Sequence, residues 1–69
     1  MSLADNIRHY REKKNITQKE LAETVGITQQ ALSLFEQGVK VPGIITAVDI
    51  AKNLDTTVEQ LVNRKEQTE

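Results

Sequence analysis

Residues 17–38 read TQKELAETVGITQQALSLFEQG and contain two short amphipathic segments separated by a single glycine. Thr17 and Glu20 have the spacing of a capping box, in which each side chain accepts a hydrogen bond from the other residue's backbone amide, so a helix begins there. Gly26 ends this helix, because glycine adopts the left-handed conformation without steric cost. Thr28 can cap a second helix that fills the rest of the stretch. Two short helices joined by so tight a turn predict a helix-turn-helix unit.

The sequence on either side predicts three further helices. Apolar residues recur at helical spacing in residues 3–14, 44–54 and 58–62. Pro42 and Gly43 form a break before the fourth helix, because proline disfavours the helical conformation in the residue before it. The fold class is therefore all-α, a single five-helix domain with the helix-turn-helix at its second and third helices.

The fourth predicted helix carries the widest apolar stripe in the chain. We expect its buried positions to be Ile44, Ala47, Val48, Ala51 and Leu54, with Ile45 and Ile50 on the flanks of the stripe.

The length of 69 residues allows one hydrophobic core and is too short for two. We expect one domain over residues 1–69, folded from about 3 to 62, with a frayed tail at 63–69. No stretch approaches the roughly 20 apolar residues of a membrane helix, and the N-terminus lacks a signal-peptide pattern. These features predict a cytoplasmic protein that does not enter a membrane.

The composition excludes several classes of chemistry. There is no cysteine and only one histidine, so neither a disulfide framework nor a zinc site can be assembled, and we expect no metal or cofactor. No phosphate-binding glycine loop or nucleophile motif is present, so we do not expect an enzyme. A chain of this size also leaves no room for a ligand-sensing domain, so no small-molecule ligand is expected.

The net charge of −1 argues mildly against nucleic-acid binding, which relies on Lys and Arg. The charges are not evenly spread, however. Residues 1–40 hold six basic and five acidic side chains, whereas residues 41–69 hold three basic and five acidic ones. A DNA contact is therefore expected in the N-terminal part of the chain.

The helix over residues 28–37 has an outward face made almost only of amides and hydroxyls: Gln29, Gln30, Ser33 and Gln37, with Leu34 at its edge. A Gln side chain can bind the N6 and N7 atoms of adenine together in the major groove of DNA. The N-terminal residues of the second helix in a helix-turn-helix are those that reach base edges. This face therefore predicts the reading of double-stranded DNA.

The chain resembles the phage repressor and Cro-like helix-turn-helix family over about residues 7–61. The residues that carry the resemblance are Thr17 to Ala22, Val25 to Gln30, Ser33, Phe35 to Gly38, and Pro42. The resemblance implies a lambda-repressor-like DNA-binding domain. It also implies a sequence-specific transcriptional regulator, a repressor, that binds a two-fold symmetric operator as a homodimer.

The resemblance also implies roles for individual residues. Gln18 would bind a phosphate, while Gln29, Gln30 and Ser33 would face bases. Leu34 departs from the polar or basic residue common in the family, so it either contacts a thymine methyl group or contributes little to binding, and it could also be a partly buried packing residue.

Phosphates are expected at two helix N-termini, at the start of the second helix and in the loop before the fourth, where Lys40 lies. The full set of predicted phosphate contacts is Gln18, Lys19, Thr28, Gln37 and Lys40.

Glu36 lies at the border of the buried face of the third helix, where a carboxylate needs a partner. Arg11 is the candidate, and the family resemblance implies that this Arg–Glu pair ties the first helix to the third. It is a structural ion pair in this interpretation.

Two points stay open. Ile45, Ile50 and the apolar face of the fifth helix are candidates for the dimer surface, although they could equally complete the core. A second hypothesis keeps the fold but makes the chain a protein-binding module, such as an antitoxin-like or anti-regulatory partner. It would use the fourth and fifth helices, and the acidic balance of the C-terminal part is its main support.

Overall fold

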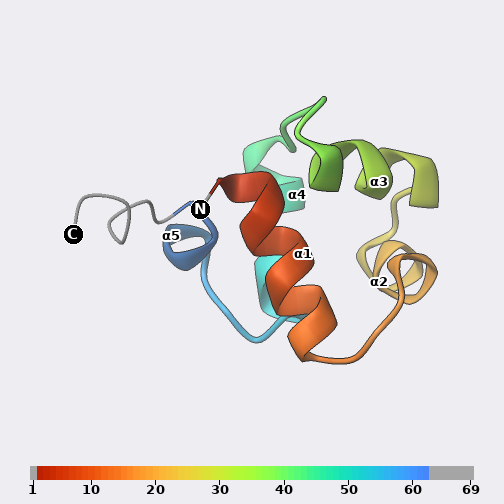
Figure 1. Cartoon of the computed structure of the whole chain (residues 1–69), viewed down its shortest axis with the longest axis horizontal. Helices are drawn as coiled ribbons and strands as arrows, with labels where there is room; N and C mark the ends of the chain where they lie inside the picture. The colour runs from red at the N-terminus through yellow and green to blue at the C-terminus, as the bar shows by residue number, and fades with distance from the viewer. Residues whose placement is uncertain (1, 63–69) are drawn as a thin grey trace.

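The computed structural model describes residues 2–62, which form five α-helices and no strand in that range (Figure 1). The helices are α1 (Leu3–Lys13), α2 (Gln18–Val25), α3 (Gln29–Gln37), α4 (Ile44–Asn53) and α5 (Val58–Leu61). The all-α, five-helix prediction is confirmed, and each helix ends within one or two residues of its expected bound. The prediction of a frayed tail at 63–69 lies outside the described residues. In the part of the chain that the structure describes, no helix has both the length and the apolar character needed to cross a membrane.

Side-chain caps fix where most of the helices begin. Every helix except α4 starts at a hydroxyl that accepts a hydrogen bond, 3.0 to 3.1 Å long, from the backbone amide three residues further on; these caps are Ser2, Thr17, Thr28 and Thr57. The cap of α2 is a complete capping box, because Glu20 Oε1 also accepts from the backbone amide of Thr17 at 2.8 Å. α4 begins at Gly43 without any side-chain cap.

The core lies around α1, which runs through the middle of the molecule in Figure 1 and packs against α3 and α5. α4 covers the other side and packs against α2 and α5. The most completely enclosed large side chains, one or more from each helix, are Ile7, Leu21, Leu32, Ile50 and Leu61. Each contributes about 1.5–3 kcal/mol relative to an exposed position. This single core holds the second and third helices in place for the site described below.

The buried stripe of α4 differs from the sequence prediction at three residues: Ile44, Val48 and Ile50. Ile50, expected on the flank, is fully buried, whereas Ile44, expected in the stripe, is 70% exposed. Val48, also expected in the stripe, is only partly buried. Ala47, Ala51 and Leu54 are buried as expected. The first turn of α4, with Ile44 and the equally exposed Ile45, projects past the core. The apolar residues do recur at helical spacing as predicted, but α4 buries its apolar side chains only from Ala47 onward.

Polar side chains of α1 also tie it to the C-terminal part of the domain. Asn6, buried between helices, donates from Nδ2 to the carbonyl oxygen of Leu61 at 2.7 Å. At the other end of α1, Lys14 Nζ donates to Asn53 O at 2.9 Å and to Asp55 Oδ2 at 2.8 Å. These contacts join α1 to α5 and to the C-terminal end of α4.

Candidate nucleic-acid interface

The turn between α2 and α3 is short and closed by backbone hydrogen bonds. Gly26 has a φ of 88°, and its amide and that of Ile27 donate to the carbonyl oxygen of Ala22 at 2.9 and 3.0 Å. Figure 1 shows α2 nearly end-on while α3 lies across the view, so the two helices cross steeply. α3 therefore lies along one margin of the molecule, with its outer face uncovered.

The outer face of α3 carries the polar residues that the sequence predicted. Gln29, Gln30 and Gln37 are exposed, and Ser33 and Leu34 are partly exposed. The carboxamides of Gln29 and Gln30 make no hydrogen bond to any residue of the described range 2–62, so their donors and acceptors are free for another molecule. Gln37 Nε2 donates to Ser33 Oγ at 2.8 Å, which orders these two side chains one turn apart.

A shallow pocket of about 520 Å³ lies beside the first half of α3. Its lining comes from α3 and from the loop that follows it: Thr28, Gln30, Ala31, Leu34, Phe35, Lys40 and Val41. Leu34 thus takes part in a solvent-open apolar surface rather than in the core. The pocket brings together four residues that the sequence analysis assigned to DNA: Thr28, Gln30, Leu34 and Lys40.

Sequence analysis missed the apolar part of this loop. Val41 is 76% exposed and lines the pocket, and Val39 is 65% exposed. The signal was available in the sequence, because Val39 and Val41 lie on either side of Lys40 in a segment that ends at Pro42. Val39 and Val41 belong to no apolar stripe of a helix, so the sequence gives no reason to place them in the core.

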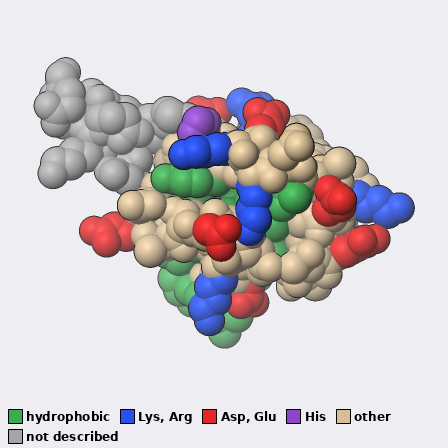
Figure 2. Space-filling view, turned by 90° about the horizontal axis from the view of Figure 1, so that it is seen from below, with side chains coloured by type: hydrophobic (Ala, Val, Ile, Leu, Met, Phe, Trp, Pro, Cys, Tyr) green, Lys and Arg blue, Asp and Glu red, His purple; other side chains and the backbone are tan. Residues whose placement is uncertain are grey.

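The outer face of α3, called the reading face below, has no exposed charged residue. In the sequence, the nearest lysine before it is Lys19 and the nearest after it is Lys40. Between Thr28 and Gly38 the only charged residue is Glu36, which is buried. Lys19 and Lys40 are exposed, and neither forms an ion pair with another residue of the described range. On the side of the molecule away from α3, basic and acidic side chains are interspersed (Figure 2). In the sequence that flanks α3, the exposed positive charges assigned to DNA are the two single lysines Lys19 and Lys40.

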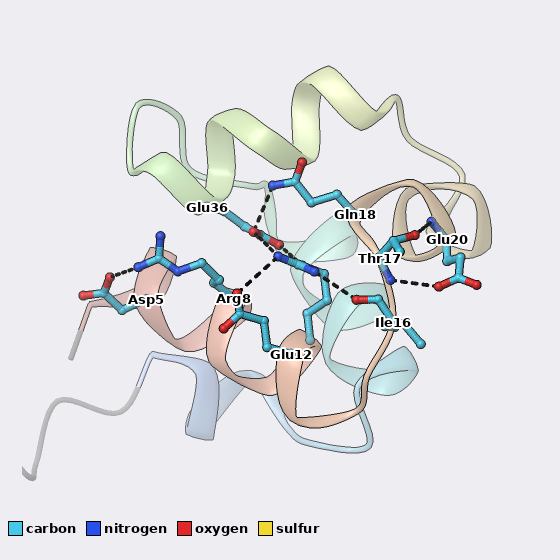
Figure 3. Close-up of polar contacts among 9 residues, drawn as sticks. Asp5, Arg8, Glu12, Ile16, Thr17, Gln18, Glu20 and Glu36 are labelled. Atoms are coloured by element: carbon cyan, nitrogen blue, oxygen red, sulfur yellow. Dashed lines mark hydrogen bonds and ion pairs between the residues drawn. The ribbon is translucent and has the colours of Figure 1, made fainter.

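Arg11 and Glu36 form a close pair between α1 and α3 (Figure 3). Arg11 Nε donates to Glu36 Oε2 at 2.7 Å and Nη2 donates to Oε1 at 3.0 Å, while Nη1 donates to the carbonyl oxygen of Ile16 at 2.9 Å. The side chains are 11% and 3% exposed. The hydrogen bond to Glu36 raises the pKa of Arg11 above its already high ordinary value, so the guanidinium stays charged at every working pH.

Gln18 takes part in the same network. Its Nε2 donates to Glu36 Oε1 at 3.0 Å, so the carboxylate of α3 is held from α1 and from the first residue of α2. The backbone amides of Gln18 and Lys19 have no hydrogen-bond acceptor among residues 2–62, because the capping box satisfies only those of Thr17 and Glu20. The phosphate role of Gln18 stays a prediction.

Comparison with known proteins identifies the fold and the family. The helix-turn-helix family model matches residues 7–61. The chain is 33% identical over 63 residues to the control protein C.SmaI of Serratia marcescens. The aligned region covers 91% of this chain and 75% of C.SmaI. It is 30% identical over 59 residues to the uncharacterised HTH-type transcriptional regulator YqaE of Bacillus subtilis. This match covers 86% of the present chain but only about half, 51%, of YqaE.

Among solved structures, the P22 c2 repressor in complex with a synthetic operator superimposes with a TM-score of 0.87 at 25% identity, over 91% of this chain and 96% of the repressor chain. The range matched by the family model includes α2, the Gly26 turn and α3. The chain therefore belongs to the helix-turn-helix family, and its fold is that of the phage-repressor type.

Proposed function

We propose that this protein is a sequence-specific repressor that places α3 in the major groove of a two-fold symmetric operator, acting as a homodimer in the cytoplasm. The observation that carries the proposal is the pair of exposed, unengaged carboxamides, Gln29 and Gln30, on the first turn of the second helix of the unit. We assign no catalytic step to the chain.

The base contacts follow from the outer face of α3. Gln29 and Gln30 each have the donor and the acceptor needed for a bidentate contact with adenine. Ser33 keeps a hydroxyl hydrogen to donate to a base while it accepts from Gln37. Leu34 offers an apolar surface to the C5-methyl group of thymine. The preferred half-site is therefore rich in A·T pairs.

The phosphate contacts would position α3 without reading sequence. At the start of α2, the unpaired amides of Gln18 and Lys19 and the Lys19 ammonium group suit one phosphate. Thr28 and Lys40 border the pocket beside α3 and suit a phosphate on its other side. Gln37 would reach the backbone from the C-terminal end of α3.

The dimer surface that we propose is an apolar shoulder made of Val39, Val41, Ile44 and Ile45, which are 65–76% exposed. The candidates Ile50 and Leu61 are fully buried, so they complete the core and are not available for a partner. Between residues 38 and 48 only Lys40 is charged, so two copies could bring this shoulder together without extensive like-charge repulsion. Four aliphatic side chains make a small interface, so the dimer would form mainly on DNA.

The test is a selection of duplexes from a random pool by the purified protein at low salt. We expect a two-fold symmetric site with half-sites about one helical turn, roughly 34 Å, apart. Gln29→Ala/Gln30→Ala should lose this site while keeping its helical circular dichroism spectrum. Glu59→Gln, an exposed change on α5, is the matched control and should select the same site.

If no duplex enriches for the folded wild-type protein, DNA reading is not its function. The second hypothesis, a protein-binding module, would then apply, and the projecting first turn of α4 is the observation that would favour it.

A further inference from the structure

The carboxamide of Gln18 is fixed by an acceptor that can receive hydrogen bonds but cannot donate them. Glu36 forms an ion pair with Arg11, and a carboxylate only accepts hydrogen bonds, so the nitrogen of the Gln18 amide faces it. Figure 3 shows this orientation: the Gln18 nitrogen lies toward Glu36, and its oxygen points away. A surface glutamine normally samples many rotamers and both amide orientations, whereas this one is held in a single pose.

Glu36 can impose that pose because it is itself immobile. Its side chain is only 3% exposed, and two nitrogens of Arg11 hold its oxygens at 2.7 and 3.0 Å. Arg11 is in turn anchored on the carbonyl oxygen of Ile16, two residues before Gln18. The chain of contacts therefore runs from α1 through a buried carboxylate of α3 to the first side chain of α2.

The contact with Glu36 uses only one of the two hydrogens on the Gln18 amide nitrogen. An amide nitrogen has two hydrogens, and one of them is donated to Glu36. The second hydrogen remains at the start of α2, where the backbone amides of Gln18 and Lys19 also have no acceptor among residues 2–62. These donors belong to the residues at which the proposed function places a phosphate, so immobilising the side chain before DNA arrives removes an entropy cost of binding.

We infer that Glu36 is a positioning residue for DNA binding: through its hydrogen bond it pre-orients the Gln18 carboxamide toward the phosphate backbone, in addition to joining α1 to α3. This inference rests on the proposed function for its DNA-binding consequence. It does not rest on it for the orientation of Gln18, which can be measured without DNA.

The experiment is a double-mutant cycle on the affinity for the duplex that the wild type selects from the random pool. Gln18→Ala removes the positioned group, and Arg11→Met/Glu36→Met replaces the ion pair by apolar side chains of similar volume, which buried sites usually tolerate. We expect Gln18→Ala to weaken binding about three- to tenfold in the wild-type background. In the Arg11→Met/Glu36→Met background it should weaken binding less than twofold.

Lys19→Ala is the matched control, because Lys19 is the next residue but makes no contact with Glu36. Its loss should have the same effect in both backgrounds. Equal effects of Gln18→Ala in the two backgrounds, or no effect in the wild type, would overturn the inference.

A second measurement needs no DNA and remains decisive if no duplex is selected. In ¹⁵N relaxation spectra, the side-chain amide of Gln18 should be ordered in the wild type and mobile in Arg11→Met/Glu36→Met. The amides of Gln29 and Gln30 serve as internal references and should be mobile in both. A Gln18 amide that is mobile in the wild type, or ordered in both proteins, overturns the positioning role, whereas the failure of the proposed function alone shows as ordered Gln18 without DNA binding.

Discussion

The carboxylate of Glu36 is nearly out of contact with water and accepts three hydrogen bonds, two from Arg11 and one from Gln18. Taking both charges out of water costs free energy that their attraction only partly returns, so a buried pair adds little net stability. A buried charge without its partner is far less favourable, because nothing offsets its desolvation. Removing one member of the pair should therefore lower the stability of the domain much more than replacing both.

Arg11→Ala should lower the free energy of unfolding by about 3–5 kcal/mol, because it leaves Glu36 buried without its counter-charge. For a domain of this size, this corresponds to a fall in Tm of about 12 °C or more. Thermal unfolding followed by circular dichroism measures the change. Arg11→Met/Glu36→Met is the control and should melt close to the wild type; an Arg11→Ala protein that also melts there would contradict the prediction.

At the scale of elements, the steep crossing of α2 and α3 depends on one left-handed residue. Gly26 has a φ of 88°, and a Cβ atom placed on it would meet nothing within 4 Å. A side chain at this position is therefore opposed by backbone strain alone and not by a clash. The turn can be tested without disturbing the packing around it.

Gly26→Ala should destabilise the domain by about 1–2 kcal/mol, the cost of a left-handed backbone for an ordinary residue. Gly26→Asn should lose less, because asparagine enters this region more readily. Urea midpoints measure both changes. Gly43→Ser serves as the comparison: Gly43 caps α4 with a φ of −64°, and a hydroxyl there should leave stability equal or a few tenths of a kcal/mol higher. A Gly26→Ala midpoint equal to that of the wild type would show that the turn is not strained.

The helix starts could be predicted because their signals are local. Thr17 and Glu20 satisfy each other's amides within one turn, so nothing outside residues 17–20 has to be known. The buried seam of α4 was different. Ile44 and Ile50 are both compatible with an apolar stripe through Ala47 and Ala51, and only the position of the other helices decides which of them is covered. That information is absent from the periodicity of a single helix.

The same distinction holds for the candidate site. The face of α3 could be predicted, because Gln29, Gln30 and Ser33 share one side of one helix. The contact between Gln18 and Glu36 could not, because it crosses from α2 to α3 and depends on how the turn at Gly26 rotates them. Tertiary contacts of this kind follow only from the packed structure.

At the scale of the whole molecule, a net charge of −1 leaves DNA affinity to a few local cations. Lys19 and Lys40 are the exposed cations assigned to the two sides of the neutral reading face. Each phosphate neutralised by a lysine releases condensed counterions, which makes the affinity depend on salt. Phosphate contacts and base contacts should therefore respond differently to ionic strength.

Lys40→Ala should weaken binding to all duplexes by a similar factor and lower the slope of log K against log salt by about 0.9 for each phosphate that the side chain no longer neutralises. Fluorescence anisotropy over a salt series gives both numbers. Gln29→Ala and Gln30→Ala, which remove uncharged groups, should lower the specific affinity with no change in slope. A Lys40→Ala protein with the wild-type slope would remove Lys40 from the set of phosphate contacts.

Ile44→Ser/Ile45→Ser should weaken binding to the full two-fold symmetric site while leaving the affinity for an isolated half-site unchanged, because the apolar shoulder contacts only the second copy. Sedimentation of the protein–duplex complex gives the number of copies bound. The Tm should stay within a few degrees of the wild type, since both side chains are at least 70% exposed. Undiminished two-copy binding would place the dimer surface elsewhere.

Four of the five helices in residues 2–62 begin at a hydroxyl that caps an amide only three residues away. Each start is therefore encoded within one turn, and the chain has few long loops to close before its helices meet. Helical domains dominated by such short-range contacts fold in microseconds to milliseconds. A protein that refolds this quickly after each unfolding event is folded, and therefore able to bind, for nearly all of the time it is unbound. In the proposed function, diffusion and copy number, not refolding, then set how soon a vacated operator is occupied again.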